Sequence, residues 1–207
     1  MIELQFPVLG QSLPTDHGYL LYSALSGLIP PLHSDGESVA VGPISGQWTG
    51  NGVLALASPR SRLRLRLPAE QIASVLPLAG KALDIGGHRV RLGVPTVQTL
   101  VPAPALAAKM VTIKGFMEPE TFLAAAQRQL DELGIHGKLG IPVLQDASRA
   151  GEPRRKVMRI REKKVVGFAL HATELTAEES IILQERGLGG RRKMGCGFFA
   201  PVRPRSR

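Results

Sequence analysis

The segment from Gly187 to Gly197 combines glycines with three consecutive cations, a pattern that suits phosphate binding. Glycine has no Cβ and tolerates positive φ, so the N–H groups of a glycine-rich backbone can approach a phosphate closely. The segment does not match the nucleotide-binding glycine motifs, because it lacks Gly-Lys-Ser/Thr and Arg192 replaces the last glycine of Gly-x-Gly-x-x-Gly. We expect an RNA-binding or phosphate-binding loop, with an ordinary glycine turn as the alternative. Its candidate binding residues are Gly187, Gly189, Gly190, Arg191, Arg192, Lys193, Gly195 and Gly197.

A second basic pattern is an alternation of arginines with Ser61 and leucines. The arginines are Arg60, Arg62, Arg64 and Arg66. Since successive side chains of a strand point to opposite faces, the four guanidinium groups would share one face, about 6.5 to 7 Å apart. That spacing approximates the phosphate spacing of a nucleic acid, although a solvated strand face is the alternative. A further basic region with Arg154, Arg155 and Lys156 is a candidate for binding the opposite strand of an RNA stem.

The composition favours a polyanionic partner, because 26 Lys and Arg against 17 Asp and Glu give a net charge of +9. Cys196 is the only cysteine, which excludes an intrachain disulfide and a cysteine-based zinc site within one chain. We expect neither a metal nor a cofactor. Because no leader pattern or long apolar stretch is evident, we expect a cytoplasmic protein without a membrane partner.

Hydrophobic periodicity predicts the same order of elements in both halves of the chain. In the first half we expect strands at 2–8, 39–41, 53–57, 60–67 and 88–92, and helices from residue 15 or 16 to Pro30 and over 68–76. In the second half we expect strands at 106–114, 157–160, 165–170 and 197–202, and helices over 118–133 and from 176 to 187. Thr176 and Glu179 have the spacing of a capping box at the start of the last helix.

Two successive βαββαβ units correspond to an α+β fold with tandem ferredoxin-like domains and a C-terminal glycine-rich loop. The first domain would span residues 1–95 and the second residues 105–207. The proline-containing segment 96–104 is expected to link them.

A glycine-rich loop between the last helix and last strand of such a second domain resembles the signature of the CRISPR-associated repeat-RNA endoribonucleases of the RAMP superfamily. Residues 21–25 followed by 31–33 are similar to that family's arrangement of a tyrosine in the first helix and a histidine after it. Residues 111–115 and 183–192 look like the small, myxobacterial-type branch of this family of guide-RNA maturation nucleases.

The resemblance implies metal-independent cleavage of a CRISPR repeat stem-loop, in which a 2′-OH attacks the adjacent phosphorus and leaves a 2′,3′-cyclic phosphate and a 5′-OH. Tyr22 and His33 are the catalytic pair that it implies. Histidine suits this chemistry because its ordinary pKa of about 6.5 lets it accept or donate a proton near neutral pH. His33 could be the base or the acid. His17 is its competitor, with capping or packing at a helix N-terminus as the alternative role.

Two other functions remain open at this level. The first is a non-catalytic RNA-binding subunit of a type I CRISPR effector complex, whose other subunits would then be partners. The second is a general or ribosome-associated RNA-binding domain. Because only 4% of the residues are aromatic, we expect RNA recognition to depend on shape and phosphates more than on base stacking.

Overall fold

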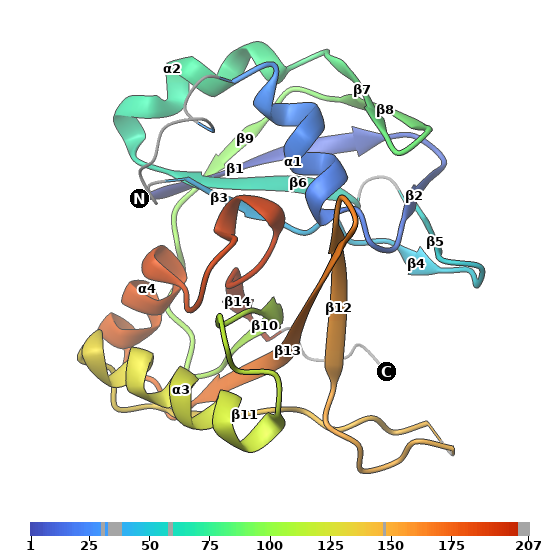
Figure 1. Cartoon of the computed structure of the whole chain (residues 1–207). Coiled ribbons are helices and arrows are strands. Elements are labelled where there is room, and N and C mark those ends of the chain that lie inside the picture. Colours follow the sequence, from blue (N-terminus) through green and yellow to red (C-terminus); the bar gives the residue numbers. More distant parts are fainter. Residues whose placement is uncertain (30–31, 33–38, 58–59, 147, 203–207) are drawn as a thin grey trace. The chain divides into compact units, whose positions relative to one another are not determined.

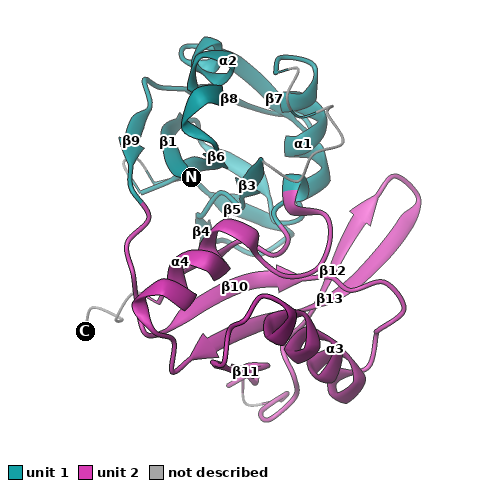
Figure 2. Cartoon of the chain, turned by 90° about the vertical axis from the view of Figure 1, so that its left-hand side faces the viewer, with its two compact units in different colours: residues 1–99, 193–195 teal, residues 100–192, 196–207 magenta. Residues whose placement is uncertain are grey.

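The computed structural model describes residues 1–29, 32, 39–57, 60–146 and 148–202 (Figure 1). The chain divides into two compact units (Figure 2): unit 1 comprises Met1–Thr99 with Lys193–Gly195, and unit 2 comprises Leu100–Arg192 with Cys196–Arg207. The division after Thr99 lies within the expected linker, 96–104. That linker is shorter than the sequence predicts, because Thr96–Gln98 form strand β9 and pair with the first strand. The inclusion of Lys193–Gly195 in unit 1 was not expected from the sequence.

Unit 1 contains an antiparallel six-stranded sheet of order β3-β6-β1-β8-β7, with β9 paired to β1. Its strands are β1 (Ile2–Leu9), β3 (Ala40–Gly42), β6 (Arg62–Leu67), β7 (Ala82–Ile85), β8 (His88–Leu92) and β9 (Thr96–Gln98). Its helices are α1 (Gly18–Ser26) and α2 (Ile72–Val75). If β1, β3, β6 and β8 are numbered 1 to 4 in chain order, their order across the sheet from β8 to β3 is 4-1-3-2. This is the strand order of a ferredoxin-like βαββαβ unit.

Alternating apolar residues of β1 and β6 form the core of unit 1. Leu4 and Phe6 of β1 and Leu63 and Leu65 of β6 are fully buried in the cluster that also contains Leu21 and Leu25 of α1. The predicted helix over 68–76 is broken into the 3₁₀ turns Ala69–Gln71 and Leu76–Leu78 around the single turn of α2. Pro77 contributes to this break, because proline has no backbone N–H to donate.

A small three-stranded antiparallel sheet of order β2-β5-β4 also belongs to unit 1. It consists of β2 (Ser12–Pro14), β4 (Gln47–Trp48) and β5 (Val53–Ala55). The strand predicted at 53–57 therefore belongs to this sheet rather than to the main one.

Unit 2 repeats the topology with a five-stranded sheet of order β11-β13-β10-β14 and with β12 paired to β13. Its strands are β10 (Leu106–Val111), β11 (Lys138–Gly140), β12 (Arg155–Ile160), β13 (Lys163–Thr173) and β14 (Phe199–Pro201). Its helices are α3 (Pro119–Glu132) and α4 (Ala177–Arg186). If β10, β11, β13 and β14 are numbered 1 to 4 in chain order, their order from β14 to β11 is again 4-1-3-2. The prediction of an α+β fold with two ferredoxin-like units is confirmed.

The local signals of unit 2 are also confirmed. Phe122 of α3 packs on Phe168 of β13, with ring centroids 4.8 Å apart, in the centre of the unit's core. Thr176 and Glu179 form the capping box that the sequence predicts, since each side chain accepts a hydrogen bond from the other residue's backbone N–H. In the part of the chain that the structure describes, no helix has the length and apolar character needed to cross a membrane.

Candidate functional site

Three glycines of the segment 187–197 are required by the fold of the protein. Gly187, Gly189 and Gly197 have φ of 63°, 70° and 64°, in the left-handed region. A Cβ at Gly187 would lie 2.3 Å from the Gly197 carbonyl oxygen, and one at Gly197 would lie 2.3 Å from that of Leu188. At Gly189 it would lie 2.4 Å from the Thr112 carbonyl oxygen. Side chains at these three positions would force the backbone apart.

Several amides of this segment donate hydrogen bonds inside unit 2. The N–H groups of Gly190 and Gly197 donate to the carbonyl oxygens of Thr112 and Met110, at 2.9 and 2.8 Å. The Gly189 N–H donates to Oε1 of Gln129 at 2.8 Å. The sequence suggested that these amides seat phosphates, but here they attach the segment to β10 and α3. Phosphate binding by the amides of Gly189, Gly190 and Gly197 would therefore require these hydrogen bonds to break.

The three cations of the segment have different environments. Arg191 is exposed and donates a 3.4 Å hydrogen bond to Oγ1 of Thr112. Arg192 is 7% exposed, and its guanidinium donates to the Glu185 carbonyl oxygen near the end of α4. Lys193 belongs to unit 1, where its Nζ donates to the Leu32 carbonyl oxygen at 3.2 Å. Arg192 thus has a structural role, whereas Arg191 is accessible to a ligand and Lys193 contacts the residue that precedes His33 in the chain.

His17 is buried and both of its ring nitrogens are hydrogen-bonded. Its Nδ1 lies 2.8 Å from the Pro14 carbonyl oxygen, and its Nε2 accepts the Ile44 N–H at 3.1 Å. Because a carbonyl only accepts and a backbone N–H only donates, the neutral Nδ1–H tautomer satisfies both contacts. His17 therefore connects the start of α1 to the loop after β3, and a catalytic role for it is not retained. His33 lies outside the described residues.

Tyr22 lies on α1 and is half-buried against the core of unit 1. Leu21 and Leu25 of the same helix are fully buried and anchor α1 on this core. The core contact corresponds to the packing role that is usual for a tyrosine, and it is compatible with a phenol held in a fixed position.

The four alternating arginines are not equivalent. Arg66 is 1% exposed, and its Nε donates to Oε2 of Glu3 at 2.9 Å. Gln5 donates to the other oxygen of the same carboxylate at 2.8 Å. Arg62 and Arg64 are half-buried and Arg60 is exposed. The expectation of four RNA-binding guanidinium groups is thus corrected to three, because Arg66 neutralises a buried carboxylate.

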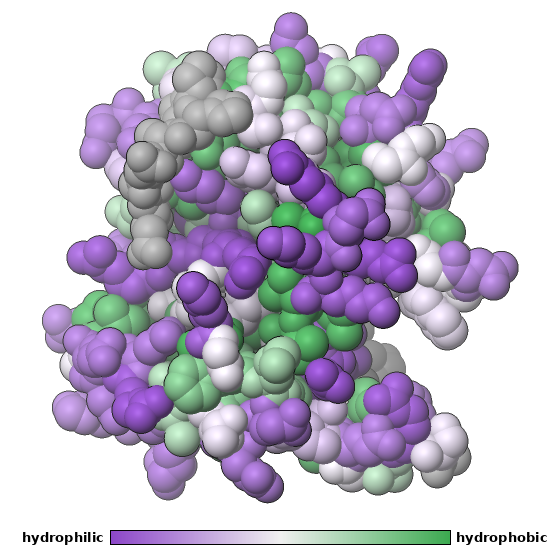
Figure 3. Space-filling model, in the orientation of Figure 1, coloured by the Kyte–Doolittle hydropathy of each residue, from purple (hydrophilic) through white to green (hydrophobic). Residues whose placement is uncertain are grey.

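The basic region after residue 149 continues into the hairpin of β12 and β13, which is drawn in orange in Figure 1. Arg155 and Lys156 start β12, and Arg159 lies directly opposite Lys164 across the hairpin. Desolvation, and to a smaller extent the nearby charge of Arg154, lowers the pKa of Lys156. The whole Lys156 residue is nevertheless exposed. Figure 3 shows that hydrophilic side chains cover much of one face of each unit, with smaller apolar areas between them.

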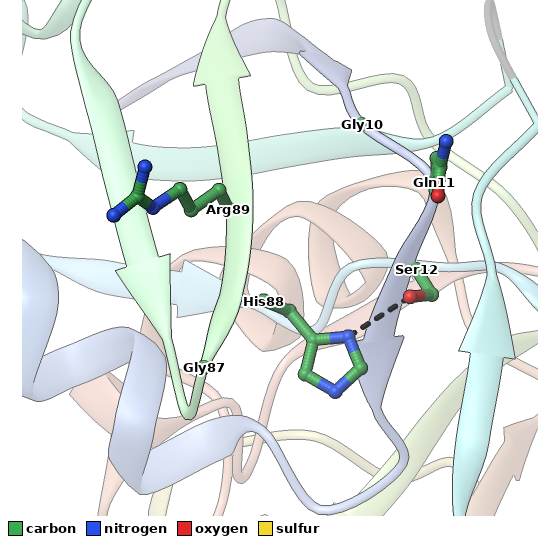
Figure 4. A pocket seen from close by; sticks show the side chains of 6 residues that line it. All are labelled: Gly10, Gln11, Ser12, Gly87, His88 and Arg89. Carbon is green, nitrogen blue, oxygen red and sulfur yellow. Dashed lines mark hydrogen bonds between the residues drawn. The ribbon is translucent and has the colours of Figure 1, made fainter.

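An open pocket of about 410 Å³ lies in unit 1 beside β2 and the turn between β7 and β8 (Figure 4). It is lined by Gly10, Gln11, Ser12, Gly87, His88 and Arg89. Nδ1 of His88 lies 2.9 Å from Oγ of Ser12, while the Arg89 side chain points to the other side of β8. The pocket contains none of the predicted site residues.

The sequence of the chain is similar to a known protein family and to a characterised protein. A family model described as Cas6 Crispr matches residues 2–204. A CRISPR-associated endonuclease Cas6 from Myxococcus xanthus (strain DK1622) is 44% identical over 200 residues, which cover 97% of this chain and 81% of the relative.

Solved structures support the fold. A RAMP protein described as binding different RNA substrates aligns with a TM-score of 0.70 and 11% identity, over 98% of this chain and 100% of the other. A structure of a Cas6-related gene product from Pyrococcus furiosus aligns with a TM-score of 0.67 and 12% identity, over 97% and 98% of the two chains.

Proposed function

Because the chain belongs to the Cas6 family of CRISPR-associated proteins, we propose that it cleaves CRISPR repeat RNA in precursor transcripts to give guide RNAs. The observation that carries this proposal is the 44% identity to the Cas6 endonuclease of Myxococcus xanthus over 97% of the chain. The family resemblance predicted from the sequence is confirmed, while the reaction and its residues are inferred below.

The proposed reaction is an internal transesterification. The 2′-oxygen forms a bond to the adjacent phosphorus, its proton passes to a base, and the bond from phosphorus to the 5′-oxygen breaks. The leaving 5′-oxygen takes up a proton, so the products carry a 2′,3′-cyclic phosphate and a 5′-OH. His33 is proposed as the base or the acid, since an imidazole can do either near neutral pH.

Tyr22 and Lys193 are proposed to assist this step. The core contacts of α1 hold Tyr22, so its phenol can orient the 2′-OH or a phosphate oxygen without a large loss of side-chain entropy. Lys193 donates a hydrogen bond to the carbonyl of Leu32, the residue that precedes His33 in the chain. A cation near the reacting phosphate would stabilise the negative charge that develops on it.

In addition to the role of Lys193, RNA binding is proposed for the predicted binding cations that are not buried. In unit 1 these are Arg60, Arg62 and Arg64. In unit 2 they are Arg154, Arg155, Lys156 and Arg191, all of which are exposed. Each phosphate contact that is lost should reduce the slope of log affinity against log salt concentration by about 1, and Arg155→Ala is the first variant to measure.

The decisive experiment is incubation of the purified protein with its repeat RNA in excess EDTA. We expect a single cut that yields two fragments with different ends. The 5′ fragment should carry the cyclic phosphate at its new 3′ end and resist ligation until that group is removed, and the 3′ fragment should carry a 5′-OH that accepts phosphate from a polynucleotide kinase. His33→Ala should bind the repeat with unchanged affinity and not cut it. His136→Ala, which removes an exposed histidine of unit 2, is the matched control and should cut normally.

Each other outcome of this assay has a definite meaning. Cleavage only in the presence of a divalent metal would overturn the proposed mechanism. Tight binding without cleavage in all conditions would favour the non-catalytic subunit of a type I effector complex. Equal binding of unrelated hairpins would favour a general RNA-binding domain.

A further inference from the structure

Trp48 is the only tryptophan of the chain, and 69% of its surface is exposed. It lies on β4, the outer strand of the small β2-β5-β4 sheet of unit 1. An indole is a large apolar surface, and leaving it in water forgoes the stabilisation that burial would provide. Exposure of this side chain therefore suggests a binding role.

The fold holds Trp48 in a defined position. Leu13, Leu54 and Trp48 are direct neighbours across the three strands, and exposure increases from the fully buried Leu13 through the half-buried Leu54 to Trp48. Side chains opposite one another in a sheet share a face, so the indole continues an apolar row that starts in the core.

The turn that follows Trp48 is tightly closed. Gly50, Asn51 and Gly52 all have positive φ, and the Val53 N–H donates to the Gly50 carbonyl oxygen at 3.0 Å. The Gly52 carbonyl oxygen in turn accepts the Thr15 N–H at 2.7 Å. These hydrogen bonds order the hairpin of β4 and β5 before any ligand binds. The entropy cost of binding through the indole is therefore reduced.

Two arginines are next in sequence to a residue that is hydrogen-bonded to the segment before β4. Ser61 donates from Oγ to the Ser45 carbonyl oxygen at 2.8 Å, which ties the segment before β4 to the start of β6. Arg60 and Arg62 are the neighbours of Ser61 in sequence, and neither is buried. An exposed aromatic ring and accessible arginines on connected segments are the residue types of a single-strand nucleic-acid site.

We propose that Trp48 is a stacking platform for one unpaired base of the RNA, with the adjoining phosphates bound by Arg60 and Arg62. This inference rests on the proposed RNA function of the protein. The low aromatic content predicts RNA recognition through phosphates and shape. The stacking site would add recognition of one base. A base is favoured over an apolar protein partner because the chain has a net charge of +9, and because Ser61, between Arg60 and Arg62 in sequence, is hydrogen-bonded to the segment that precedes β4.

The test combines tryptophan fluorescence with three substitutions at one position. Because the chain has one tryptophan, its fluorescence reports Trp48 alone, and saturation with repeat RNA should quench it. Trp48→Ala and Trp48→Leu should each weaken repeat binding about tenfold, whereas Trp48→Phe should remain within about twofold of wild type. The salt dependence of binding should not change in these variants, since stacking releases no counterions. Leu76→Ala removes another exposed apolar side chain of unit 1 and should have no effect.

A series of repeat RNAs with single abasic sites identifies the stacked base. One abasic RNA should bind wild type as weakly as the intact RNA binds Trp48→Ala, and should bind that variant without further loss. Unchanged affinity of Trp48→Ala with normal repeat cleavage would overturn the stacking site alone. If Trp48→Leu bound repeat RNA with wild-type affinity, an apolar protein contact would be indicated instead. Self-association of the wild-type protein that is lost in Trp48→Ala would indicate the same. No binding of repeat RNA by the folded wild-type protein would overturn both this inference and the proposed function.

Discussion

Arg66 and Glu3 form a buried ion pair across neighbouring strands, with 2.9 Å between Nε and Oε2 and both side chains 7% exposed or less. The pair lies in direct register on β6 and β1. This ion pair gives Arg66 a structural role that differs from the role proposed for Arg60, Arg62 and Arg64.

We expect Arg66→Ala to lower the free energy of unfolding by about 3 to 5 kcal/mol, because the Glu3 carboxylate would remain buried without its cation. Arg62→Ala should cost about 1 kcal/mol or less and should weaken RNA binding instead. Urea denaturation and RNA titration of both variants measure these opposite effects. The double variant Glu3→Leu with Arg66→Met should be less destabilised than either single loss, and a greater loss in the double would contradict this view of the pair.

His17→Ala and His33→Ala should have opposite phenotypes. His17→Ala leaves the Ile44 N–H without its acceptor, so we expect a loss of about 1 to 3 kcal/mol of stability. The folded fraction of that variant should still cut repeat RNA. His33→Ala should retain its stability and lose cleavage. Thermal unfolding and single-turnover cleavage compare the two, and a stable but inactive His17→Ala would restore His17 as the catalytic candidate.

Gly189→Ala and Gly197→Ala should each destabilise the protein by about 2 kcal/mol or more, because the new methyl would strain positive-φ backbone against carbonyl oxygens. Gly190 is the matched control. A Cβ at Gly190 has no atom within 4 Å, so Gly190→Ala should melt near the wild-type temperature. Equal melting temperatures for all three variants would show that the segment adjusts to side chains.

The capping box gives unit 2 a dependence on acid pH. The pKa of Glu179 lies below its ordinary value of 4.5, because its carboxylate accepts the backbone N–H groups of His136, at 2.7 Å, and of Thr176, at 2.8 Å. Its stabilising contribution is therefore fully present above about pH 4.5 and is lost as the pH falls through the lowered value. Glu179→Gln should flatten the pH dependence of the urea midpoint in this range, whereas Glu178→Gln, at an exposed position of the same helix, should not.

The cap itself can be tested separately at neutral pH. Thr176→Ala removes the side-chain acceptor of the Glu179 N–H and should cost about 1 kcal/mol. Thr176→Ser keeps a hydroxyl there and should remain near wild type in the same urea experiment.

The features that local sequence signals determine were predictable. The spacing of Thr176 and Glu179 predicts the start of α4, and apolar periodicity ended by Gly134 predicts α3. Strands β2, β4, β7, β9 and β11 were not predicted, and each has only two to four residues. Strands this short show little alternation, although the equally short β3, β5 and β14 overlap predicted strands.

The candidate site was less predictable, because its contacts join distant residues. Nothing within the sequence near Arg66 reveals that Glu3 neutralises it. The glycine content of 187–197 is local, but the reason for it at Gly189 is the carbonyl of Thr112 on another part of the chain. The exposure of Trp48 follows from its place on an outer strand, which only the sheet order reveals.

The strand order of unit 2 also has a consequence for its synthesis. β10 pairs with both β13 and β14, and β14 is the last strand of the unit in chain order. During synthesis on the ribosome, β10 is made first, but the sheet of unit 2 is complete only when β14 can pair with it. Unit 1 can close its main sheet much earlier, since β9 ends at Gln98. We therefore expect vectorial folding in which unit 1 forms its main sheet first and unit 2 acquires its full hydrogen-bonded sheet only after β14 has emerged from the ribosome.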